Sequence, residues 1–255
     1  MVTLGTPDRS GRGPADWFEA VAASPRPAVV DYAAGEDRVE LSGRVLANWA
    51  AKTANLLDAE GLGAGSTVAV DLPAGWQPLA ALLGLARAGV GVVFTAAGAA
   101  TDADLVITDD PSAWEASPAE LWAVAPEDGQ APAHALDFTA EVRVQADRCP
   151  LPVPHGDLVA QSAHWADDAA DGTAGVTDRA GTGPARWIRR ERGLVVAAQG
   201  ERLHRGLAGA VLQAWAAGLP VVLVPADHAD DDGAARIVAA ERLGGLPGEG
   251  GPGGR

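Results

Sequence analysis

An arginine cluster is the part of this sequence best suited to hold an anion. Arg186, Arg189, Arg190 and Arg192 form the one basic cluster of an acidic chain. Guanidinium groups bind phosphates and carboxylates through paired, charge-assisted hydrogen bonds, so the cluster suits a phosphate or an acidic partner. The alternative is a solvated face whose charge balances nearby aspartates.

Two glycine- and threonine-containing segments, 172–175 and 181–183, superficially look like phosphate loops. Neither has the Walker spacing or a lysine, and no clear helix follows either one directly, which favours an ordinary loop over an anion site. Any mechanism that needs a lysine must use Lys52, because the chain has no other. Lys52 falls in the middle of an expected helix, where a solvated surface residue is the simpler interpretation.

The remaining reactive side chains do not form a recognisable catalytic or metal-binding set. His164 and His228 each have aspartates close by in sequence, but no third element supplies further ligands, so helix-end charge effects are favoured over a metal site. Cys149 has no activating base near it, and no Gly-x-Ser-x-Gly elbow is present. We therefore predict no catalytic residue, metal or cofactor from these patterns.

Composition narrows the classes of partner. The chain has 255 residues and a formal net charge of −15, which disfavours binding to nucleic acids and to anionic membranes. No uninterrupted apolar stretch is long enough to span a bilayer, and residues 1–14 lack the apolar core of a secretory signal. One cysteine allows no intramolecular disulfide, so we expect a cytoplasmic protein.

Strands and helices alternate along the chain, which predicts an α/β fold with mainly parallel sheet covered on both faces. A helix is expected to begin after its N-cap Ser42 and to break at Gly61, and another is expected to end at Gly89. We expect strands over 28–32, 39–41, 67–72, 90–94, 105–108, 141–145, 194–198 and 221–224, and further helices over 15–23, 76–88, 113–124, 156–169, 206–217 and 232–243.

The proline content of residues 126–154 suggests a seam between two Rossmann-like lobes. The resulting division is a flexible N-terminus over 1–14, a first α/β lobe over 15–125, the seam over 126–154, a second α/β lobe over 155–243, and a disordered Gly/Pro-rich tail over 244–255.

The order of these elements and several local motifs resemble the N-terminal region of adenylate-forming (AMP-binding) enzymes. Segments 39–57, 61–73 and 76–94 are similar to that family's first helix, its turn and strand, and its next helix and strand. Residues 155–159, HGDLV, resemble the start of the helix after the family's phosphate loop, and residues 202–224 resemble a later helix and strand. The chain also looks like a group of short, uncharacterised, AMP-binding-like proteins of actinobacteria, with the family's fold in truncated form.

The resemblance implies a phosphate loop rich in glycine, serine and threonine, with a lysine, just before His155. Residues 144–154, VQADRCPLPVP, contain none of these residue types, and their three prolines remove amide donors. The family's adenine- and magnesium-binding motif, its ribose motif and its catalytic lysine are also not found in the sequence.

We therefore predict a non-catalytic relative of adenylate-forming enzymes that binds a partner protein or a small acyl or nucleotide ligand. Candidate ligand-binding residues are His155, His204, Arg186, Arg189 and Arg190. Three alternatives stay open: an enzyme of unrelated chemistry in the cleft between the lobes, an adenylate-forming activity completed by another subunit, and a structural subunit of a larger assembly.

Overall fold

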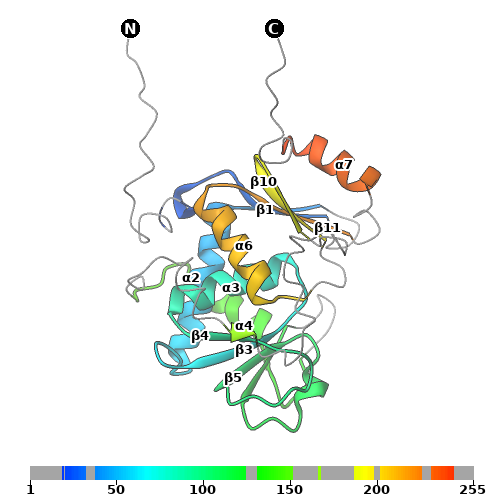
Figure 1. The fold of residues 1–255 in the computed structure, drawn as a ribbon. Helices are drawn as coiled ribbons and strands as arrows, with labels where there is room; N and C mark the ends of the chain where they lie inside the picture. The colour runs from blue at the N-terminus through cyan, green and yellow to red at the C-terminus, as the bar shows by residue number, and fades with distance from the viewer. Residues whose placement is uncertain are drawn as a thin grey trace, which may run out of the picture.

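Two β-sheets with a layer of helices between them make up the protein (Figure 1). The computed structural model describes residues 19, 21–32, 38–124, 131–151, 166–167, 187–197, 202–225 and 231–243. The segments expected to be a flexible N-terminus and a disordered tail lie outside these residues. Of the helix expected over 15–23, residues 19 and 21–23 are described and are helical.

The first sheet combines strands from both ends of the chain. Its order is β2 (Val39–Ser42), β1 (Pro27–Asp31), β11 (Val221–Val224), β10 (Gly193–Ala197) and β9 (Trp187–Arg190). The three central strands are parallel, and the two edge strands are antiparallel to their neighbours. The expected division places β1 and β2 in the first lobe and β9, β10 and β11 in the second, although all five strands belong to one sheet.

The second sheet is parallel throughout. Its strands, in order, are β7 (Leu136–Asp137), β6 (Glu120–Ala123), β5 (Leu105–Thr108), β3 (Thr67–Asp71), β4 (Gly91–Phe94) and β8 (Ala166–Asp167). Each pair of neighbours runs in the same direction. The prediction of mainly parallel sheet flanked by helices is confirmed.

Three helices fill the space between the sheets: α2 (Gly43–Ala59), α3 (Trp76–Ala88) and α6 (Arg205–Ala216) (Figure 1). Ser42 caps α2 as predicted, since its hydroxyl accepts a hydrogen bond from the amide of Val45. Gly89 ends α3 in the left-handed conformation, also as predicted. One apolar core joins these helices to the inner faces of both sheets.

The outer faces of the two sheets are covered differently. Helix α7 (Asp231–Ala240) lies on the outer side of the first sheet, where Ile237 and Val238 pack on a small apolar cluster (Figure 1). The outer face of the second sheet is covered by connecting segments, including the 3₁₀ turn η1 (Pro111–Trp114), whose Trp114 is buried in a third cluster.

Three local expectations were wrong. Residues 141–145 are not a strand, because 141–144 belong to helix α4 (Phe138–Val144) and Gln145 is its C-cap; Asp137 caps the other end through the amide of Ala140. Residues 113–124 are not a helix: η1 ends early, Pro118 interrupts the segment, and β6 follows. The helix expected over 156–169 is contradicted at 166–167, which pair with β4; its other residues lie outside the described chain.

Candidate functional site: the junction of the two sheets

The second sheet changes its winding direction between β3 and β5. The chain leaves β3 through α3 to reach β4 on one side, and it leaves β5 through η1 to reach β6 on the other side. In open parallel sheets, the crevice outside the carboxyl ends of two such strands is the usual place for a ligand. Asp71 and Thr108 are the last residues of β3 and β5, so they mark this crevice.

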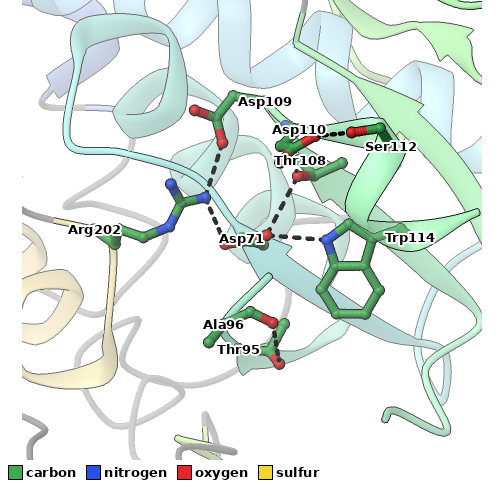
Figure 2. Close-up of polar contacts among 9 residues, drawn as sticks. All are labelled: Asp71, Thr95, Ala96, Thr108, Asp109, Asp110, Ser112, Trp114 and Arg202. Atoms are coloured by element: carbon green, nitrogen blue, oxygen red, sulfur yellow. Dashed lines mark hydrogen bonds and ion pairs between the residues drawn. The ribbon is translucent and has the colours of Figure 1, made fainter. Parts of the chain in front are cut away.

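Asp71 is fully buried and takes hydrogen bonds from three directions (Figure 2). Its Oδ2 accepts from the indole Nε1 of Trp114 at 2.9 Å and from the hydroxyl of Thr108 at 3.4 Å. Its Oδ1 accepts from Nη2 of Arg202 at 2.5 Å. A buried carboxylate is stable only when hydrogen bonds and an opposite charge replace its lost hydration, and this set supplies both.

Arg202 reaches the crevice from the chain that leads into the first sheet's helix α6. The same Nη2 also lies 2.8 Å from Oδ1 of Asp109, so one nitrogen joins two carboxylates (Figure 2). Desolvation of the half-buried guanidinium lowers the pKa of Arg202. The hydrogen bond to Asp109 and the charge of Asp71 outweigh this effect, so the pKa of Arg202 lies above its ordinary value. The guanidinium is therefore a permanent cation held in a fixed orientation.

Backbone contacts also hold Arg202 and its neighbour in place. Arg202 forms an antiparallel bridge with Pro73, and the amide of Leu203 donates to the carbonyl of Leu72 at 2.8 Å. These contacts join the loop after β3 to the segment before α6. The two sheets are thus connected directly at the crevice.

A second buried aspartate holds the same loop from the other side. Asp31 ends β1 of the first sheet, is 2% exposed, and accepts a hydrogen bond from the amide of Trp76 at 3.1 Å. Trp76 begins α3, whose N-cap residue Gly75 has no side chain to cap it. Asp31 supplies that missing acceptor and places a negative charge at the positive end of the helix dipole.

The structure places His204 at this junction. It is the N-cap of α6, and its Nδ1 accepts a hydrogen bond from the amide of Gly206 at 3.2 Å. Arg189 and Arg190 lie instead on β9, the edge strand of the first sheet. His155 and Arg186 lie outside the described residues. A ligand-binding role for all five residues stays a prediction.

Sequence reasoning missed the aspartates and the arginine that build the junction. A usable signal was present, because the apolar runs of β1 and β3 both end in aspartate and β5 is followed by Asp109 and Asp110. At the carboxyl end of a buried parallel strand, a charged residue must find a partner. Nothing local identified Arg202 as that partner.

Lys52 is not the solvated surface residue that the sequence suggested. Its side chain is 18% exposed, and its ammonium group donates to the carbonyls of Arg143, at 3.0 Å, and Gln145. It also forms an ion pair with Asp147, 3.1 Å from Oδ1. These three partners match the three N–H groups of a lysine ammonium.

A cavity of about 580 Å³ lies beside η1, β6 and β7, away from the contact between the two sheets. Its walls include Trp114, Glu120, Leu121 and His134. Trp114 separates this cavity from the crevice, since its ring lines the cavity and its N–H bonds Asp71.

No group of three or more metal-binding side chains converges among the described residues. None of the described helices is both long and apolar enough to cross a bilayer.

Known proteins share parts of this sequence and this fold. No family model matches the sequence. A protein of Mycobacterium tuberculosis (strain ATCC 25618 / H37Rv) named "TIGR03089 family protein" is 36% identical over 159 residues, which cover 56% of this chain and 65% of that protein. This relative is actinobacterial, as the resemblance in the sequence suggested.

Two solved structures share the fold across nearly the whole chain. An acyl-CoA synthetase of Brucella canis superposes with a TM-score of 0.66 at 18% identity, covering 95% of this chain and 48% of that one. The N-terminal domain of FACL13 from Mycobacterium tuberculosis gives a TM-score of 0.57 at 15% identity, covering 91% and 62%. The chain thus spans less than two thirds of each relative. It has the N-terminal fold of adenylate-forming enzymes, which confirms the fold that its sequence motifs predict.

Proposed function

We propose that this protein binds a small ligand on an adenylate-forming type of scaffold and does not form acyl-adenylates by itself. The observation that carries the proposal is the engagement of Lys52, whose three N–H groups are taken by Arg143, Gln145 and Asp147. Because Lys52 is the one lysine of the chain, no other lysine side chain is available to neutralise a triphosphate.

The sequence around the expected phosphate loop supports the same proposal. Residues 144–154 lack glycine, serine and threonine, and Pro150, Pro152 and Pro154 have no amide hydrogen to donate. Amide and hydroxyl donors aimed at developing charge contribute several kcal/mol to such reactions, roughly 3 kcal/mol for a single donor. A scaffold without them retains a binding surface but not the means to stabilise the transition state.

The charges at the sheet junction indicate which ligands fit there. Asp71 and Asp109 together outweigh the charge of Arg202, so the crevice offers directed N–H groups within a net negative charge. The Nε and Nη1 groups of Arg202 have no hydrogen-bond partner among the described residues, and its side chain is 43% exposed. Such a site repels an anion in proportion to its charge, so it disfavours a triphosphate more than a carboxylate or a monophosphate.

Isothermal titration calorimetry with AMP, ATP, coenzyme A and non-hydrolysable acyl-adenylate analogues tests this proposal. We expect heat from AMP or from an acyl-adenylate analogue, none from ATP with magnesium, and a loss of about tenfold in affinity in Arg202→Met. Arg44→Met is the matched control, because Arg44 is exposed on α2 and contributes nothing to the junction. No heat from any of these compounds would refute ligand binding and leave a protein partner as the function.

A further inference from the structure

Residues 145–151, which we term the strap, follow α4 and cross helices α2 and α3. Asn55 of α2 donates through Nδ2 to the carbonyl of Ala146 at 3.0 Å and to that of Arg148 at 2.9 Å. Lys52, one turn earlier on α2, holds the carbonyl of Gln145 and the carboxylate of Asp147. The first half of the strap is thus held by two side chains of one helix.

Arg87 of α3 holds the second half of the strap. Its Nη2 donates to the carbonyl of Leu151 at 2.5 Å and, more weakly, to that of Cys149 at 3.4 Å. Arg87 is buried, with 6% of its surface exposed. Together, three side chains from α2 and α3 bind five carbonyl groups of a seven-residue segment.

Within the described part of the chain, few other contacts hold the strap. Among the described residues, its one backbone hydrogen bond runs from the amide of Gln145 to the carbonyl of Val142 in the last turn of α4. Most of its side chains are exposed, and none is part of the apolar core. A segment with few buried apolar contacts and no ladder of backbone hydrogen bonds opens at a lower free energy than the core.

We propose that the strap is a releasable unit, which opens from α2 and α3 while both sheets stay folded. Its attachment depends on donors that lie on other elements, so the strap can leave without breaking any strand pairing of the described residues. Release frees the Nδ2 group of Asn55 and withdraws two strap carbonyls from Arg87, while Lys52 keeps its hydrogen bond to the carbonyl of Arg143 in α4. The strap is therefore a conformational device that can uncover a row of hydrogen-bond donors.

The single cysteine of the chain provides a direct probe, since Cys149 lies within the strap and is partly buried. The experiment measures the rate of Cys149 alkylation by iodoacetamide in the native full-length protein, together with thermal unfolding by circular dichroism. Asn55→Asp removes the two donor groups and places a negative charge against carbonyl oxygens. Lys52→Met removes the ammonium at similar side-chain length, and Asp58→Asn, an exposed change one turn later on α2, is the control.

We expect Asn55→Asp and Lys52→Met each to raise the alkylation rate about tenfold, because each removes two polar contacts of the strap. Circular dichroism should show both variants folded, and Asp58→Asn should match the parent rate. Unchanged alkylation in both variants would overturn the proposal. The proposal would also be overturned if the alkylation rate of the parent protein rose with urea in proportion to the globally unfolded fraction. Cys149 would then react only after both sheets unfold.

Discussion

The pairing of Arg202 with two carboxylates of different burial yields a quantitative prediction. One nitrogen, Nη2, contacts Asp71, which is fully buried, and Asp109, whose side chain is 38% exposed. Arg202→Met keeps the aliphatic stem but leaves the carboxylate of Asp71 without its cation. Trp114 and Thr108 still bond that carboxylate, so part of its lost hydration stays replaced.

The magnitude follows from burial. Removing one partner of a fully buried ion pair costs about 3–5 kcal/mol, and the partial exposure of Arg202 reduces this to about 2 kcal/mol. In a double-mutant cycle with Asp71→Asn, most of that loss should reappear as coupling, about 1.5 kcal/mol. A second cycle with Asp109→Asn should give about 0.5 kcal/mol, the value typical of exposed pairs.

Urea unfolding monitored by circular dichroism measures all three free energies under the same conditions. The second cycle is an internal control, because it uses the same guanidinium and the same chemical change at the carboxylate. Equal coupling of Arg202 to both aspartates would contradict the view that burial of Asp71 governs this contact. A loss below about 0.5 kcal/mol in Arg202→Met would show that the crevice does not depend on the ion pair.

Two further predictions concern the outer side of the first sheet and the packing of the middle layer. Burial of Tyr32 and the 2.5 Å hydrogen bond between its hydroxyl and Glu241 raise the pKa of the phenol. The free energy of unfolding should therefore be unaffected by this group below pH 10, and it should fall as the pH rises from 10 through the higher pKa of the folded state. Absorbance at 295 nm follows this one tyrosine directly, and Glu241→Gln should move its titration back toward pH 10; an unchanged titration would disprove the role of Glu241. A Cβ at Gly84 would lie 2.3 Å from Cβ of Thr53, so Gly84→Ala should lower the free energy of unfolding by about 1–3 kcal/mol. Urea unfolding should show partial rescue by Thr53→Ala, and additive losses in the double variant would contradict direct overpacking.

The central helices could be predicted because their ends carry local signals. Ser42 caps α2 and Gly89 ends α3, and both signals depend on residues within one turn of the helix end. The wrong assignment at 141–145 came from the alternation of Val142 and Val144, which has the period of a strand. The cap at Asp137 and the burial of Val142 one turn after Phe138 favour the helix instead.

The arrangement of the sheets could not be read from local patterns. β1 pairs with β11, although Val29 and Val221 are far apart in sequence, so dividing the chain by position separates strands that lie side by side. The crevice has the same origin, since Asp71 and Arg202 are separated by 131 positions. Lys52 was misjudged for a related reason, because its partners belong to a segment more than ninety positions away.

Release of pyrophosphate from ATP by the purified chain is the most direct test of the account. The assay supplies ATP, magnesium and carboxylic acids of several lengths, without other proteins, and follows pyrophosphate through a coupled phosphate reporter. Because the one lysine is held by Arg143, Gln145 and Asp147, and residues 144–154 contain no glycine, serine, threonine or lysine, we expect no release above the rate without the protein. Acid-dependent release of pyrophosphate by the chain alone would contradict it.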